Sequence, residues 1–126
     1  MSTTFVFIDD EAICNLISKA ILIRNYPDAQ IFIFQSGIDA INYFEANADQ
    51  FKTEKMLIIL DINMPEMNGF EFLVEYEKRF ATAFDSDVFI LSSSINLNDE
   101  TKARQFKIVK NFYSKPFQLS YVEGYV

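Results

Sequence analysis

The residues with the clearest chemical potential in this 126-residue chain are acidic, and they follow apolar segments. Asp9, Asp10 and Glu11 come directly after one apolar run, and Asp61 comes directly after another. Carboxylates that meet in a fold repel one another, so they need a cation or a proton to coexist. Mg²⁺ prefers carboxylate, carbonyl and water oxygens, whereas a group of residues without His or Cys disfavours zinc. If the two segments lie side by side, the acidic residues predict a magnesium site.

A hydroxyl group and an ammonium group complete the set of candidate residues. Ser92, Ser93 and Ser94 follow a further apolar run, and Lys115 stands near the carboxyl end of the chain. Taken singly, such residues are also common as helix caps, turn residues and solvated charges. Beside a magnesium ion, a hydroxyl and an ammonium can neutralise the oxygens of a phosphoryl group in transfer. This interpretation makes Asp61 the nucleophile that receives the phosphoryl group.

Short apolar runs must position these residues, and none of the runs alternates apolar with polar side chains. Continuous runs of β-branched and aromatic residues are typical of strands covered on both faces, as in a parallel sheet between helices. The runs occupy residues 5–8, 31–34, 56–60 and 88–91. A weaker fifth strand is expected over about residues 111–114.

The segments between the strands carry the spacing of amphipathic helices. In the first of them the apolar residues recur along one stripe, the pattern of a helix surface that faces a core. The members of this stripe are Ala12, Ile13, Leu16, Ile17, Ala20 and Ile21. Further helices are expected around residues 38–44 and 72–80, over a polar segment at about 98–106, and around Leu119 and Val122. Residues 47–55 are polar, and of all segments this one is expected to form a long loop.

Strands that alternate with helices along the whole chain predict a doubly wound α/β fold with right-handed crossovers. With 50% hydrophobic and 23% charged residues, the chain has the size and composition of one globular domain. We therefore expect residues 1–126 to form a single domain without an effector domain. In such open sheets ligands bind outside the carboxyl ends of the strands, which is where the candidate residues fall.

Composition and charge argue against some classes of binding partner. The 11 basic and 18 acidic residues give a formal charge of −7, so direct binding to nucleic acid is not expected. Histidine is absent, so any phosphohistidine must belong to a partner. Cys14 is the one cysteine, and no apolar run approaches the roughly 20 residues that a membrane helix needs. We expect a cytoplasmic protein with no membrane partner.

In four places the sequence resembles the receiver domain of bacterial two-component response regulators, in its single-domain, chemotaxis-regulator-like form. Residues 7–11 resemble the acidic pair after the first strand, and residues 60–69 resemble the phosphoacceptor motif with its Pro and Gly. Residues 91–93 resemble the hydroxyl position after the fourth strand, and residues 114–117 resemble the Lys-Pro motif, a family position for a cis peptide bond. The resemblance covers nearly the whole chain and implies a flavodoxin-like fold of five parallel strands in the order 2-1-3-4-5.

The resemblance also implies how the acidic residues act in a phosphorylation switch. Asp9 and Asp10 would hold Mg²⁺ directly or through water, and Asp61 and the backbone carbonyl of Asn63 would complete the protein ligands. Asp61 would accept a phosphoryl group from a histidine kinase or a histidine phosphotransfer protein. The implied chemistry is limited to phosphorylation and dephosphorylation of the chain itself, so an enzyme acting on other substrates is not expected.

Two further residues are expected to bind the phosphoryl group, and two aromatic residues to respond to it. Ser92 would hydrogen-bond one phosphoryl oxygen and Lys115 would pair with another, with Ser93 as the alternative if the strand register differs by one residue. The family's switch aromatic precedes the Lys by three residues, which is Phe112 here, with Tyr113 beside it. The response would reach an unknown downstream protein through the face made by the polar helix, the fifth strand and the last helix.

Three other classes of protein share parts of this pattern. A phosphohydrolase of the haloacid dehalogenase type carries the motif Asp-x-Asp, in which the second Asp is the general acid. Asn63 stands at that position here, and an amide cannot supply the proton, so this class is disfavoured. A flavodoxin-like cofactor binder cradles phosphate on neutral groups after the first strand, where this chain has acids. A docking module that receives no phosphate is opposed by the intact set of Asp61, Ser92 and Lys115.

Overall fold

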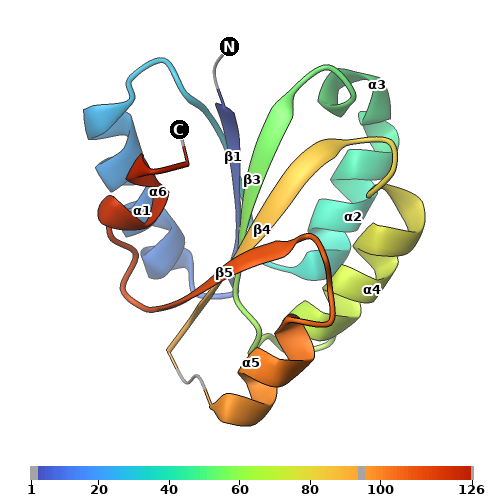
Figure 1. The fold of residues 1–126 in the computed structure, drawn as a ribbon. Helices are drawn as coiled ribbons and strands as arrows, with labels where there is room; N and C mark the ends of the chain where they lie inside the picture. Colours follow the sequence, from blue (N-terminus) through green and yellow to red (C-terminus); the bar gives the residue numbers. More distant parts are fainter. Residues whose placement is uncertain (1–2, 94–95, 126) are drawn as a thin grey trace.

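The computed structural model describes residues 3–93 and 96–125 of the chain, and its centre is a parallel sheet (Figure 1). The strands lie in the order β2-β1-β3-β4-β5, as the resemblance implies. Their bounds are β1 (Thr3–Ile8), β2 (Gln30–Phe34), β3 (Lys55–Leu60), β4 (Asp85–Ser92) and β5 (Val109–Ser114). Every neighbouring pair is parallel, so the predicted doubly wound α/β fold is confirmed.

Helices cover both faces of the sheet, as Figure 1 shows. They are α1 (Ala12–Asn25), α2 (Gly37–Ala46), α3 (Ala48–Phe51), α4 (Gly69–Arg79), α5 (Leu97–Ala103) and α6 (Ser120–Glu123). α1 and α6 lie on one face, and α2, α4 and α5 lie on the other, which explains why the apolar runs of the central strands do not alternate. α1 is the longest with 14 residues, and none of the helices in the described part of the chain could span a bilayer.

Each face of the sheet packs on its own hydrophobic core. Val6 and Ile8 of β1 belong to the core beneath α2 and α4, whereas Phe5 and Phe7 belong to the core beneath α1 and α6. Side chains alternate along a strand, so one apolar run supplies both cores. The core beneath α2 and α4 is crowded with aromatic rings, whose contacting pairs have centroids 5.0–6.4 Å apart. These rings are Phe44, Phe51, Tyr76, Phe80 and Phe84.

The apolar stripe predicted for the first helix does not face the core, so that expectation is wrong. Ile13 is 71% exposed and Leu16 is 62% exposed. The buried residues of α1 are instead Asn15, Ser18 and Leu22, which recur at helical spacing on another side of the helix.

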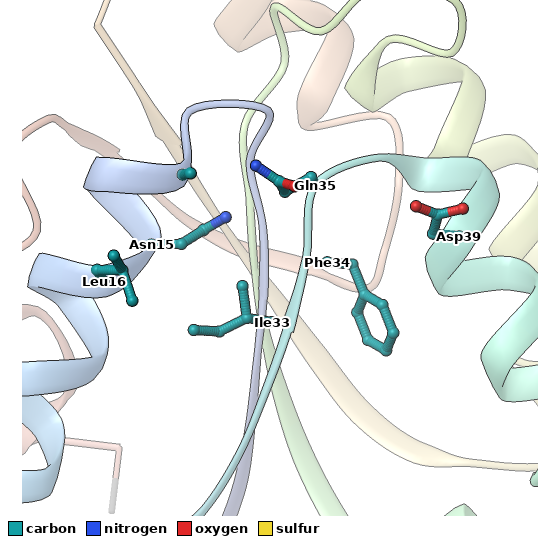
Figure 2. Close-up of a pocket in the computed structure, with 7 residues that line it drawn as sticks. Asn15, Leu16, Ile33, Phe34, Gln35 and Asp39 are labelled. Carbon is teal, nitrogen blue, oxygen red and sulfur yellow. The ribbon is translucent and has the colours of Figure 1, made fainter.

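A hydrogen bond explains how α1 is rotated about its axis. The side-chain amide of Asn15 donates to the backbone carbonyl of Asp9 at 2.8 Å, in a buried position just after β1. Figure 2 shows Asn15 pointing from α1 toward the strand ends, beside a hollow that Leu16, Ile33 and Gln35 help to line. Turning the apolar stripe inward would break this bond and leave a buried polar group unpaired, which costs about 1–3 kcal/mol.

Several elements differ from the sequence expectation in their bounds. Residues 47–55 do not form one long loop, because α3 lies within them and buries the side chain of Phe51. β5 begins at Val109, two residues earlier than expected, and α5 already ends at Ala103. The last helix, α6, has four residues and thus completes a single turn.

Candidate functional site

The candidate residues stand at the carboxyl ends of neighbouring strands. The backbone N–H of Asp61 donates to the carbonyl of Ile8 at 2.9 Å, so the residue after β3 stays beside the end of β1. The N–H of Lys115 donates to the carbonyl of Ser92 at 3.0 Å, which joins the ends of β5 and β4 in the same way. These bonds continue the parallel ladders and bring Asp9, Asp61, Ser92 and Lys115 to one end of the sheet.

Three carboxylates form the centre of the site. Oxygen atoms of Asp9, Asp10 and Asp61 lie within 4.8 Å of one another. Asp9 is 6% exposed and Asp61 is 4% exposed, whereas Asp10 is more exposed than either. Carboxylate oxygens at this spacing, with no nitrogen or sulfur ligand among the three residues, fit a hard divalent cation such as Mg²⁺.

The surroundings of Asp61 disfavour its charged form. Burial raises the pKa of its carboxyl group, and the neighbouring carboxylate of Asp9 raises it further. The ammonium group of Lys115 and the backbone N–H of Asn63 act in the opposite direction, and the balance raises the pKa of Asp61 to about 6. At neutral pH the Asp61 carboxyl group is therefore mostly ionised, but its charge is electrostatically unfavourable. A cation bound beside it would stabilise that charge.

Lys115 places an ammonium group among these carboxylates, and a cis peptide bond joins it to Pro116. Its Nζ atom lies 2.7 Å from Asp9, 3.0 Å from Glu11 and 3.3 Å from Asp61. Burial lowers the pKa of Lys115, but hydrogen bonds to Asp9 and Glu11 more than offset burial and raise that pKa above its ordinary value. The ammonium group thus stays charged, and it contacts two carboxylates that a metal ion would also contact.

The side chain of Asn63 links the end of β3 to the end of β4. One carboxylate oxygen of Asp61 accepts a hydrogen bond from the backbone N–H of Asn63 at 3.2 Å, and the Asn63 amide donates to Ser92 Oγ at 3.2 Å. Ser92 is fully buried and Ser93 is exposed, so the geometry favours Ser92 as the hydroxyl on the side of Asp61. Ser94 lies outside the described residues.

The turn after Asp61 brings the start of α4 close to the site. The N–H of Gly69 donates to the carbonyl of Ile62 at 2.8 Å. A Cβ atom at Gly69 would lie 2.7 Å from the carbonyl oxygen of Asp61 and 2.8 Å from Cα of Ile62, which is closer than side chains approach. Asn68 and Glu71 then cap α4 through reciprocal hydrogen bonds. Glycine is thus required here for steric reasons, because the helix begins against the backbone of Asp61.

The two predicted switch aromatics lie on opposite faces of β5. Phe112 packs against the core beneath α2 and α4. Tyr113 packs on the other core, where its ring stacks on Tyr121 with centroids 4.1 Å apart. Ile90 of β4 pairs with Phe112, and alternation along β4 puts Ser92 on the same face as Ile90. Phe112 therefore shares a face of the sheet with the Ser92 hydroxyl, and Tyr113 does not.

Two residues near the site received no role from the sequence. Glu11 contacts Lys115, and the sulfur atom of Cys14 lies within 4.8 Å of carboxylate oxygens of Asp9 and Glu11. Burial raises the pKa of the Cys14 thiol. Their closeness in the sequence to Asp9 and Asp10 could have indicated that they lie near the site, because both follow that acidic pair within five residues.

Comparison with known proteins supports the assignment of the fold. A family model described as the response regulator receiver domain matches residues 5–124. A two-component response regulator from Cytophaga hutchinsonii is 28% identical, with a TM-score of 0.87 over 98% of this chain and 92% of that chain. A response regulator receiver protein from Dyadobacter fermentans is 22% identical, with a TM-score of 0.82 over 96% of this chain and 92% of that chain. The chemotaxis protein CheY4 of Vibrio cholerae is 17% identical, with a TM-score of 0.80 over the whole of both chains.

No match was found among curated protein sequences. The match to the family model nevertheless runs from within β1 to the end of α6, so it includes every candidate residue. The strand order and the structural similarity agree with that match. The resemblance seen in the sequence is therefore confirmed, and this chain belongs to the response regulator receiver domain family of two-component signalling.

Proposed function

We propose that this receiver domain is a phosphorylation-dependent switch whose acceptor is Asp61. The proposal is carried by one observation, the meeting of Asp61 with Lys115 at 3.3 Å and with the carboxylates of Asp9 and Asp10 within 4.8 Å. Repulsion among three carboxylates lowers stability, so a purely structural role would not explain why they are gathered.

In the proposed reaction, a carboxylate oxygen of Asp61 attacks the phosphorus atom of a phosphohistidine on a histidine kinase or a histidine phosphotransfer protein. An O–P bond forms, the P–N bond breaks, and its electron pair returns to the imidazole nitrogen of the partner. The product is an acyl phosphate on Asp61. Because the chain contains no histidine, the donor belongs to another molecule, and we propose no reaction beyond phosphorylation and dephosphorylation of Asp61 itself.

The acidic group is suited to hold Mg²⁺ as the cofactor. We assign Asp9, Asp10, Asp61 and the backbone carbonyl of Asn63 as its protein ligands, since all of them offer oxygen atoms. When bound, Mg²⁺ would supply the positive charge that lets an anionic donor approach three carboxylates. The pKa of about 6 at Asp61 supports this need, because burial, and after it the carboxylate of Asp9, disfavour the charged form of the acceptor.

Lys115 and Ser92 are assigned to the phosphoryl group itself. The Lys115 ammonium would exchange its contact with Asp61 for a phosphoryl oxygen, acting as a compact point charge. The Ser92 hydroxyl, which accepts a hydrogen bond from the Asn63 amide, would donate one to a second phosphoryl oxygen and would be drawn toward Asp61 by it. The displacement of Ser92 would thus be the first consequence of phosphorylation.

The output is proposed to pass through the face that α5, β5 and α6 form. Phe112 supports this route because its ring shares a face of the sheet with Ser92. When the Ser92 hydroxyl moves toward the phosphoryl group, the Phe112 ring can enter the space that it leaves. Such a change shifts a population of existing conformers and creates no new fold.

Incubation with acetyl phosphate and Mg²⁺, followed by intact mass measurement, tests the proposal. We expect the wild-type chain to gain one phosphate, and Asp61→Asn to gain none. Asp28→Asn alters an exposed aspartate outside the site and should be labelled like the wild type. A phosphate on Asp61→Asn, or labelling of the wild type that EDTA does not prevent, would contradict the assignment.

A further inference from the structure

Charge is unevenly divided along this acidic chain. Residues 101–122 hold five Lys or Arg and no Asp or Glu, although the whole chain has a formal charge of −7. The remaining residues therefore carry a formal charge of −12. A concentration of one sign on a surface of the opposite sign creates a local potential that selects the charge of a partner.

Four of these five cations are exposed, and we term three of them, Lys102, Lys107 and Lys110, the basic edge. Lys102 lies on α5, Lys107 follows that helix, and Lys110 lies on β5. Among the residues that the structure describes, none of the three has a carboxylate oxygen within 4.0 Å. Arg104 pairs with a glutamate at 2.7 Å, and Lys115 belongs to the carboxylate site. Lys102 Nζ lies 4.6 Å from the centroid of the Phe70 ring, so Lys107 and Lys110 are the members of the basic edge whose charge we expect a partner to meet.

A groove adjoins the basic edge at Lys110. It has a volume of about 330 Å³ and lies between β5 and α6, where Asn111, Tyr113, Tyr121 and Tyr125 also line it. α6 has a single turn, so it leaves these three tyrosine side chains partly uncovered. In Figure 1, β5 crosses the front of the view between α5 at the bottom and α6 at the left, and the three are coloured from orange to red. Positive charge and aromatic surface are therefore adjacent.

Acidic residues of the neighbouring elements also lie around this surface. Asp87 of β4 accepts a hydrogen bond from the hydroxyl of Tyr125 at 2.9 Å. Asp99 and Glu100 lie in the first turn of α5, where a negative charge interacts favourably with the helix dipole. Glu123 lies on α6. These groups border the basic edge without pairing with it.

We propose that the basic edge and this groove bind an acidic segment of the downstream protein partner. Carboxylates of the segment pair with Lys107 and Lys110, and an aliphatic or aromatic side chain of the segment lies against Tyr113 and Tyr121. Nucleic acid fits this surface less well. It carries a phosphate at every nucleotide and would extend past the basic edge over the remaining chain of formal charge −12, whereas a peptide can confine its carboxylates to the basic edge. That the partner is the downstream target rests on the proposed function, whereas the binding itself does not require phosphorylation of Asp61.

Titration of the full chain with a synthetic peptide that intersperses Glu with Leu, followed by amide NMR spectra, tests this inference. The comparison ligands are the same peptide with Gln at every Glu position and a single-stranded oligonucleotide of matched length. We expect the acidic peptide to shift amides of α5, β5 and α6, and the Gln peptide to bind about tenfold more weakly. Added salt should weaken the acidic peptide's binding, because exposed ion pairs are screened.

Lysine variants locate the binding surface. Lys107→Gln combined with Lys110→Gln should weaken binding of the acidic peptide about fivefold or more. Lys78→Gln makes a charge change of the same kind on an exposed residue of α4 and should leave the affinity unchanged. Equal binding of the Gln peptide, an unaffected double variant, or preference for the oligonucleotide would overturn the inference. The titration is performed first on the resting chain, so a failure of Asp61 to accept phosphate would leave its result valid.

Discussion

At the scale of single residues, the site is assembled against electrostatic repulsion. Burial and the carboxylate of Asp9 raise the pKa of Asp61 to about 6, and Lys115 offsets only part of this effect. In the unfolded chain the pKa returns toward its ordinary value of 3.8. A carboxyl group whose pKa is higher in the folded state stabilises the fold only when protonated, so stability should fall as pH rises from about 4 through about 6.

Asp61→Asn should therefore raise the free energy of unfolding at neutral pH without Mg²⁺. The expected gain is about 1–2 kcal/mol, after allowance for the lost contacts with Lys115 and with the N–H of Asn63. The gain should shrink as pH falls from about 6 toward 4, where the wild-type carboxyl group becomes neutral. Urea denaturation followed by circular dichroism measures the difference, with exposed Asp28→Asn as the control. Destabilisation by Asp61→Asn at neutral pH would contradict the argument.

Glu11 supplies a second prediction at this scale, because it competes for the ammonium group of Lys115. Its carboxylate lies 3.0 Å from Nζ and its side chain is 59% exposed. A phosphoryl group on Asp61 must draw Lys115 away from this contact. Glu11→Gln should therefore strengthen the affinity for beryllofluoride, measured by calorimetry with Mg²⁺ present, by about two- to fivefold.

Two controls separate the Glu11 contact from a general change in charge. Glu77→Gln makes the same charge change at an exposed residue of α4 and should leave the beryllofluoride affinity unchanged. In a Lys115→Gln background, Glu11→Gln should have no effect, because the competing ammonium is gone. A gain that persists in that background would refute competition for Lys115 and indicate long-range electrostatics instead.

At the scale of elements, the rotation of α1 makes a direct prediction about stability. Leu22 is fully buried, whereas Leu16 is 62% exposed although it belongs to the apolar stripe. Leu22→Ala should lower the free energy of unfolding by about 2–4 kcal/mol, because it leaves a cavity in the core. Leu16→Ala should lower it by less than about 0.5 kcal/mol. Urea denaturation of both variants provides the comparison, and similar losses would mean that the stripe is buried after all.

α5 is the element with the fewest ties to the core among the longer helices. It has seven residues, and Ala103 is the one that is buried. Its N-cap Asn96 accepts a hydrogen bond from the N–H of Asp99, so the first turn is held locally and not by packing. α4, by contrast, buries five residues, among them Phe72, Leu73 and Tyr76. Small forces should therefore move α5 before they move α4.

At the scale of the whole molecule, the two ends of the helix layer on one face differ in how firmly they are packed. The aromatic rings beneath α2 and α4 pack edge-to-face around Phe44. α5 lies at the other end of the same layer, beside the edge strand β5. A change that begins at the carboxylate site is thus expected to spread along β5 and α5 while the aromatic core stays fixed.

Amide hydrogen exchange with and without beryllofluoride and Mg²⁺ tests this division. Protection should change within residues 96–115, and the amides of α2 and α4 should change little, because their aromatic core does not rearrange. Asp61→Asn treated in the same way should show no change in residues 96–115. Altered exchange confined to α1 and α2 would contradict the proposed route to the α5, β5 and α6 face.

Much of the fold and the grouping of the site residues could be predicted from the sequence. Uninterrupted apolar runs indicated buried parallel strands, and the carboxyl ends of parallel strands meet whatever the details of packing. Asp9, Asp61 and Lys115 each follow such a strand, so their proximity was already determined by the order of residues. The resemblance also placed Gly69 in the phosphoacceptor motif, whereas the close contacts that leave no room for a Cβ atom there are seen only in the folded structure.

Only the tertiary structure decided which face of each helix or strand is buried and which core it contacts. Periodicity identified α1 as a helix, but the buried bond from Asn15 to the Asp9 carbonyl accompanies a rotation that leaves Leu16 exposed. Likewise, the resemblance placed Phe112 at the switch position with Tyr113 beside it, but only the folded β5 shows that the two rings pack on opposite cores. Strand formation and helix periodicity depend on residues that are close in the sequence. The rotation of a helix about its axis, the core that a strand residue faces and the ion pairs depend on contacts between residues far apart in the chain, which only the folded molecule brings together.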